Sequence, residues 1–190
     1  FNQDIGSWVV SGVTDMAHMF TGADLFNQDL NTWTVTNVTD MKDMFEDTDL
    51  FNGDISTWDV SSVTDMEEMF QDAYSFDQDL SSWVVDSVVN MKEMFNRAYA
   101  FNGDISTWNV ISVTDMDEMF QDAYSFNGDI STWDVSSVTN MEEMFEDAYL
   151  FNQDLGDWDV TQVTDMQDML DSTAMSTENY DAILNGWAEQ

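Results

Sequence analysis

An aspartate recurs every 25 residues along this chain, and carboxylates at so regular a spacing can bind cations or anchor turns. The members of this aspartate row are Asp4, Asp29, Asp54, Asp79, Asp104, Asp129 and Asp154, and an asparagine or aspartate stands two residues before each of them. If successive copies stack about 5 Å apart, each neighbouring pair of carboxylates repels by about 0.8 kcal/mol in water, and by more near a protein surface. Some interaction must offset this repulsion.

Two interactions can do so, and the sequence leaves both open. Each aspartate can accept backbone N–H bonds in its own turn, while each asparagine bonds along the stack. Alternatively, Ca²⁺ can bind between turns, held by aspartate carboxylates with asparagine or backbone oxygens. No segment has the spacing of an EF-hand loop. We therefore expect no required cofactor, with Ca²⁺ as the candidate ion of the aspartate row.

A second row follows the recurring tryptophan, and its residue types vary as those of a contact surface do. After Val9 it continues as Thr34, Asp59, Val84, Asn109, Asp134 and Asp159. The plain interpretation of this row is solvated surface, and the functional interpretation is a ligand or partner surface. These six residues are the predicted binding residues.

Residues suited to catalysis are scarce. His18 is the only histidine and cysteine is absent, so the sequence predicts no catalytic triad, zinc site or phosphate-binding loop. Carboxylates are so numerous that glycosidase-like pairs arise by coincidence. The fifteen methionines stand at helical spacing and are expected to pack in the core. We expect that the protein is not an enzyme.

Both rows belong to seven tandem copies of one 25-residue unit, and a period of this length is typical of a solenoid. Trp58 and Val60, two residues apart, predict a short strand. Thr64 and Glu67 then form a capping box, at the start of a helix whose apolar stripe recurs at steps of three and four residues: Val63, Met66, Met69, Phe70 and Ala73.

The expected fold is therefore an α/β repeat, a curved solenoid like that of leucine-rich repeats, with one short parallel strand and one short helix per unit. Parallel strands lie about 4.8 Å apart and packed helices about 8–10 Å apart, so a stack of both must bend. The sheet would then form the concave face, and the second row would lie on it.

The chain divides into seven repeats over residues 1–175 and a final segment over residues 176–190. In the final segment Tyr180, Ile183, Leu184 and Trp187 form an apolar stripe at helical spacing. We expect this helix to cover the end of the stack, as terminal caps do. No matching cap precedes Phe1, so the face of the first repeat is expected to be open.

Charge limits the partners. The chain carries 39 acidic and three basic residues, for a formal net charge of −36. Nucleic acids and anionic membrane surfaces need a basic surface and are excluded as direct partners. No apolar run approaches the length of a membrane span, so direct insertion in a membrane is not expected. Cationic partners are favoured.

The units closely resemble the BspA-like repeats of bacterial surface proteins, which occur in lipoprotein-anchored and adhesin-like chains. The residues that carry the resemblance run from Phe151 to Met169, and segment 179–187 is similar to the terminal segment of such arrays. The resemblance implies an extracellular or cell-surface location, a leucine-rich-repeat-like solenoid and a role in attachment or surface structure. It supplies no catalytic residues.

Two functions follow as expectations. The first is a non-enzymatic extracellular module for adhesion, protein interaction or surface architecture, which binds a protein or cell-surface ligand. The second is a self-assembling structural subunit that stacks end to end through its open N-terminal face, with Ca²⁺ as a candidate stabiliser, because end-to-end contacts that do not close produce polymers. A weaker third interpretation is a salt-tolerant acidic protein whose charge maintains solubility.

Overall fold

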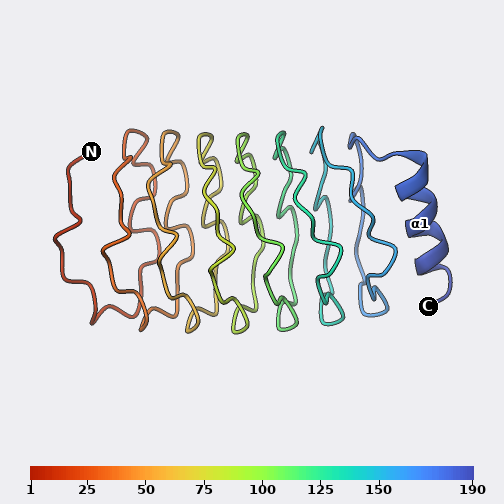
Figure 1. Cartoon of the computed structure of the whole chain (residues 1–190), viewed down its shortest axis with the longest axis horizontal. Helices are drawn as coiled ribbons and strands as arrows, with labels where there is room; N and C mark the ends of the chain where they lie inside the picture. Colours follow the sequence, from red (N-terminus) through yellow and green to blue (C-terminus); the bar gives the residue numbers. More distant parts are fainter.

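Each 25-residue repeat forms one coil, and the coils follow one another along a single axis. The computed structural model describes all residues from 1 to 190. The N-terminus lies at one end of the stack and the helix α1, Thr177–Trp187, lies across the other (Figure 1). Counting the recurring phenylalanine as repeat position 1, residues at the same position in successive coils lie beside each other.

The expected α/β repeat is wrong. The chain contains one helix, α1, and no strand. Pairing between coils that resembles a parallel sheet is confined to single bridges at repeat position 15, which run from Asp15 and Asp40 to Asn140 and Asp165. No unit contains both a strand and a helix, so the unequal spacing that was expected to bend the stack into a leucine-rich-repeat-like curve is absent, and no concave sheet exists.

Left-handed residues prevent the predicted helices. Repeat positions 18 and 22 have positive φ in all seven coils, as in Glu68 (φ 53°) and Asp72 (φ 55°) of the third coil. The N–H groups therefore alternate in direction: that of Glu68 donates to Lys92 O in the next coil at 2.9 Å, whereas that of Met69 donates to Met66 O in its own coil at 3.3 Å. A continuous α-helix needs every N–H to donate within its own segment.

The two residues of the predicted capping box, Thr64 and Glu67, bond to neighbouring coils instead of to the start of a helix. The Thr64 hydroxyl donates to Thr39 O of the preceding coil at 3.1 Å. The Glu67 carboxylate accepts from Lys42 Nζ at 2.7 Å and from Asn90 Nδ2 at 2.9 Å. These side chains therefore join neighbouring coils and do not begin a helix.

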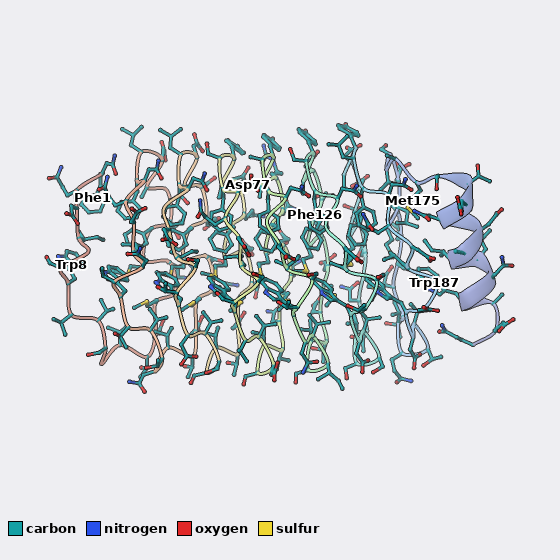
Figure 2. The ribbon with its side chains drawn as sticks, in the orientation of Figure 1. Phe1, Trp8, Asp77, Phe126, Met175 and Trp187 are labelled. Atoms are coloured by element: carbon teal, nitrogen blue, oxygen red, sulfur yellow. The ribbon has the colours of Figure 1, made fainter.

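The rows expected in the core do lie there, and they form one cluster of 53 buried residues along the stack. Rings of the same row stack from coil to coil: Phe51 and Phe76 have centroids 5.9 Å apart and planes 4° apart, and Trp58 and Trp83 have centroids 6.3 Å apart. Figure 2 shows Phe126 inside this column of rings. Burial of these aromatic rows is the main source of stability.

The last segment forms α1 and lies against the seventh coil. Ser176 is the N-cap, and its hydroxyl accepts from Asn179 N at 3.2 Å. Ile183 is buried, and Trp187 Nε1 donates to Leu155 O at 3.0 Å. The chain contains no helix of the length and apolar character that crossing a membrane requires.

Candidate functional site

The aspartate row lies at repeat position 4, where most of its carboxylates close turns. The Oδ1 atoms of Asp4, Asp54 and Asp104 accept the N–H of the residue two positions later at 2.9–3.0 Å. The same bond is made by Asp79, Asp129 and Asp154. In Asp54 the hydrogen bond from the Ser56 N–H, followed by that from its hydroxyl, lowers the pKa of the carboxyl below its usual value.

Asp29 and the neighbouring asparagine row bond along the stack. Asp29 Oδ1 accepts the N–H of Asp54 in the next coil at 3.0 Å. At repeat position 2, Asn2 Oδ1 accepts the N–H of Asn27 at 2.9 Å, and the following coils repeat this bond. Bonds within turns and along the stack are the alternative to Ca²⁺ that the sequence leaves open for the aspartate and asparagine rows. Ca²⁺ binding by the aspartate row stays a prediction.

The second row, at repeat position 9, is exposed in every coil. Thr34, Asp59, Val84, Asn109, Asp134 and Asp159 alternate with buried tryptophan and, in most coils, buried valine, as in an extended segment. A shallow groove of about 410 Å³ lies beside Asp59 and Val84, and its other lining residues are Ser56, Thr57, Trp58, Ser61 and Ser82. The structure thus brings two of the predicted binding residues to one groove.

A second groove of about 150 Å³ occupies the equivalent place between the first two coils. Val9 and Thr34 of the same row line it, with Trp8, Val10, Ser11 and Thr32. The carboxylates of the row are held in place by their own turns: Asp59 Oδ1 accepts from the Ser61 hydroxyl at 2.6 Å, and this bond is the first cause of the lowered pKa of Asp59. The row is therefore an ordered surface.

Sequence reasoning missed a third set of side chains, which we call the ionic face. It comprises repeat positions 17, 18, 21 and 22, and it holds all three basic residues and the only histidine. Each of these four side chains pairs with a carboxylate one repeat away: His18 with Asp43 at 2.8 Å, Lys42 with Glu67 at 2.7 Å, Arg97 with Asp72 at 2.9 Å, and Lys92 with Asp117.

Amide side chains bridge the carboxylates of this face. Asn96 Nδ2 donates to Glu118 Oε2 of the next coil at 2.9 Å, and Gln71 and Gln121 donate likewise to Glu93 and Glu143. The carboxylates remain crowded. Burial, followed by the charge of Glu93, raises the pKa of Glu118 to about 7.

One sequence signal would have found these pairs. Adding 25 to the number of each cationic residue, or subtracting 25 for Arg97, gives an acidic residue. His18 has no cysteine or second histidine to act with it, and its carboxylate partner Asp43 stands one coil away. The three side chains His18, Asp43 and Glu46 are the only group in the structure with three metal-ligating atoms within 4.8 Å of one another.

The comparisons with known proteins identify one family. The model of the family described as "Mycoplasma protein of unknown function, DUF285" matches residues 1–103 and again residues 79–183. Together the two matches span residues 1–183, which contain the whole repeat array. No curated protein matches the chain.

Proposed function

We propose that this chain, which belongs to the DUF285 family of Mycoplasma proteins of unknown function, is a non-enzymatic repeat module of the cell surface that binds proteins or cell-surface ligands. The observation that carries the proposal is the row at repeat position 9, which is exposed in every coil while the tryptophan before it is buried in all coils but the first. A stack that repeats one exposed row along its length offers an extended surface, as repeat proteins use for binding.

The charge of the chain favours a cationic partner. Asp59, Asp134 and Asp159 place three carboxylates along the row, within the field of a chain of net charge −36. Such a field steers cationic segments toward the surface and accelerates their association. A lysine-rich protein segment is therefore the partner class that this row fits.

The test is binding of a fluorescent decalysine peptide at two salt concentrations. A variant carrying Asp59→Asn, Asp134→Asn and Asp159→Asn retains the Oδ1 acceptors of the turns but loses three charges from the row. A control carrying Asp168→Asn, Asp171→Asn and Asp181→Asn loses three exposed charges elsewhere. We expect the row variant to bind more weakly than the control. Equal weakening in both would show binding by net charge alone and would contradict a role for the row.

The surface location has its own test. Protease added to intact cells that produce the protein should degrade it, while a cytosolic marker in the same cells stays intact. Full protection of the chain until the cells are lysed would contradict the location and leave the binding result standing.

End-to-end assembly is the second candidate function, and the ends of the stack favour it. Phe1 and Trp8 of the first coil are 59% and 52% exposed, although their rings stack on Phe26 and Trp33 as the inner rings do. Figure 2 shows both at the end opposite α1. These rings form an apolar face that a further coil, or a second copy of the chain, would cover.

The hydrogen-bonding groups at the two ends are complementary. In the first coil the main-chain oxygens of Asp15, Ala17 and Met19 accept no hydrogen bond, whereas their equivalents in the next coil accept from the first. In the last coil the N–H groups of Met166 and Asp168 donate none, because no coil follows. At these repeat positions the first coil offers acceptors and the last coil offers donors.

Light scattering of the 190-residue chain across a wide concentration range tests assembly. We expect mass to grow with concentration, and Trp8→Lys to abolish the growth. A monomer at every concentration would contradict assembly and would leave the binding proposal untouched.

A stabilising role for Ca²⁺ is tested at the aspartate row. Thermal unfolding is followed in Ca²⁺, in Mg²⁺ and in chelator at fixed ionic strength, for the wild type and for Asp104→Asn, which keeps the Oδ1 acceptor for Ser106 N. A rise in Tm specific to Ca²⁺ and reduced in the variant would support the ion. Equal Tm in all three solutions would leave the row as turn residues only.

A further inference from the structure

The carboxylate of Asp43 is the most confined charge of the ionic face. Asp43 is 5% exposed. Its Oδ2 lies 2.8 Å from His18 Nδ1, and its Oδ1 is buried without any hydrogen-bond partner. A buried carboxylate is costly unless it is paired and its lone pairs are hydrogen-bonded. Asp43 therefore lacks part of the compensation that it needs, and Asp72 and Asp117 each have a buried Oδ1 in the same state.

Other carboxylates of the ionic face have more secure partners. Asp72 and Asp117 are paired with Arg97 and Lys92, which stay charged near neutral pH. The only ion pair of Asp43 is with His18, and histidine is the one cationic side chain that can be neutral near pH 7. The charge of Lys42 also favours the Asp43 carboxylate, but Lys42 forms its ion pair with Glu67. Asp43 is thus the only one of the three whose direct ion-pair partner is not permanently charged.

The amide bridge is also missing at this coil. Asn96 donates to Glu118, the carboxylate that occupies the place of Asp43 three coils later. The first coil has Thr21 at the bridging position, and its hydroxyl donates to the main-chain oxygen of Asp43 at 2.8 Å instead of to the carboxylate. No protein donor reaches Oδ1.

Glu46 brings a second carboxylate to the same place. One ligand atom each from His18, Asp43 and Glu46 lies within 4.8 Å of the others. Burial, followed by the charge of Asp43, raises the pKa of Glu46 above its usual value. Two carboxylates and one imidazole therefore converge, and no amide side chain bridges the two carboxylates.

We propose that His18, Asp43 and Glu46 form a binding site for one divalent transition-metal ion, with Zn²⁺ as the probe. A nitrogen ligand with two carboxylate oxygens suits Zn²⁺ and its neighbours in the first row, whereas Ca²⁺ and Mg²⁺ prefer oxygen ligands only. The ion supplies a permanently charged direct partner for Asp43. Water completes the coordination from the side of His18, whose side chain is exposed to solvent.

The required movements are about 0.6 Å between His18 and Asp43 and at most about 1.4 Å for Glu46. Tetrahedral bonds of about 2.0–2.2 Å place ligand atoms about 3.4 Å apart, so Nδ1 of His18 and Oδ2 of Asp43 must separate by about 0.6 Å from their present 2.8 Å. The His18 side chain is 59% exposed and can turn by this amount without disturbing the core. The ligand form is the neutral imidazole that binds the metal through Nδ1 and keeps its proton on Nε2, so a doubly protonated His18 releases one proton to solvent on binding.

His18 makes the test direct, because a single histidine gives a single set of imidazole ¹⁵N signals. These signals are recorded for the ¹⁵N-labelled chain as ZnCl₂ is added up to one equivalent, at neutral pH and moderate salt, and Tm is measured in parallel. We expect the imidazole signals to shift and saturate at one equivalent, with a rise in Tm. CaCl₂ and MgCl₂ at the same concentrations should leave the imidazole signals unchanged.

Variants separate this site from diffuse binding to acidic surface. Asp43→Asn and Glu46→Gln each remove one ligand charge, and we expect Zn²⁺ affinity to fall by more than the about 10–100-fold loss that outer-shell changes cause. Asp168→Asn is the matched control, because Asp168 occupies the repeat position of Asp43 in the last coil, with no histidine near it. It should bind as the wild type does.

Three results would overturn the site. They are imidazole signals that stay unchanged through one equivalent of Zn²⁺, wild-type affinity in both ligand variants, and equal losses in the variants and the Asp168→Asn control. Because Glu46→Gln changes a half-buried side chain, it keeps the test decisive if Asp43→Asn does not fold. The site is independent of the proposed surface role, and its failure leaves that proposal intact.

Discussion

Trp187 of α1 makes the bond that a tryptophan of an eighth coil would make. Its Nε1 donates to Leu155 O at 3.0 Å, and Trp158 donates in the same way to Ile130 O at 3.1 Å one coil earlier. Asn179 Nδ2 likewise donates to Asn152 O at 2.9 Å, at the place where Gln153 bonds the coil before it. The helix therefore ends the stack by reproducing the side-chain bonds of a coil.

The first prediction concerns this bond. We expect Trp187→Phe to lower the free energy of unfolding by about 0.5–1.5 kcal/mol, because the change removes one of the two hydrogen bonds to Leu155 O and leaves only that from the Trp158 N–H. Urea unfolding measures the loss. Leu184→Ala is the control on the same helix, since Leu184 is 53% exposed. A loss in the control equal to that in Trp187→Phe would show that α1 stabilises the stack without this bond.

Deletion of α1 tests whether the whole helix caps the seventh coil. A chain ending at Thr173 should expose the apolar rings of the seventh coil and aggregate, because large exposed apolar patches promote association. Light scattering during purification checks this outcome. If the shortened chain stays soluble and unfolds at the same urea concentration as the full chain, α1 is not a cap.

The second prediction compares two glycines. A Cβ at Gly103 would lie 1.9 Å from Gln78 O in the neighbouring coil, whereas a Cβ at Gly12 would have no atom within 4 Å. We expect Gly103→Ala to destabilise the chain by about 1–3 kcal/mol, since the backbone of two coils must move apart. Gly12→Ala should be neutral or stabilising by up to about 1 kcal/mol. Urea unfolding of both variants checks the contrast, and equal effects would mean that the coils are farther apart at this position.

The third prediction is a dependence of stability on pH. Burial, followed by the charges of Asp43 and Glu93, raises the pKa of Glu68 from 4.5 to about 7, and Glu118 shows the same rise. Between pH 4.5 and 7 the folded chain thus holds protons that the unfolded chain releases. Stability must then fall as pH rises through this window. We expect Tm at pH 5 to exceed Tm at pH 8 in the same salt.

Variants assign this dependence to the two glutamates. Glu68→Gln combined with Glu118→Gln should raise Tm at pH 8 and flatten its variation between pH 5 and 8. Glu189→Gln, at an exposed residue near the C-terminus, should leave the variation unchanged. A double variant that varies with pH as steeply as the wild type would place the responsible groups elsewhere.

The sequence predicts the buried rows of this fold better than its backbone. Met66, Met69 and Phe70 were expected in the core and are fully buried. Their steps of three and four residues suit a helix, but they equally suit a chain that alternates turns with bonds to the next coil. The backbone at Glu68 distinguishes the helix from the coil, because its φ is positive. Glutamate is a good helix former, so the residue type does not predict this left-handed conformation.

The candidate sites also differ in how far the sequence predicts them. Exposure of the row that includes Asp59 follows from its alternation with buried tryptophan, which is visible in sequence. The pairing of His18 with Asp43 depends on which residues of adjacent coils face each other. That register is apparent from the 25-residue period alone, but the burial of Asp43 and its unpartnered oxygen follow only from packing.

The last prediction tests the left-handed backbone directly, at Asp47. This residue is exposed, has φ 53°, and occupies the repeat position at which the first coil has Gly22, with φ 69°. A β-branched residue is strongly disfavoured at positive φ, so we expect Asp47→Val to lower the free energy of unfolding by about 1–2 kcal/mol. Asp47→Gly relieves the strain and should be close to neutral.

The order of these two variants distinguishes the coil from the helix that the sequence predicts. In a helix, glycine would cost about 1 kcal/mol relative to alanine and valine less, so Asp47→Gly would be the less stable of the two. In the coil the order is reversed. Urea unfolding of both variants under the same conditions gives the answer, because the side chain is exposed and its N–H bond to Gln71 O, at 3.0 Å, is kept by either substitution. A more stable valine variant would restore the helix over this segment and with it the α/β repeat.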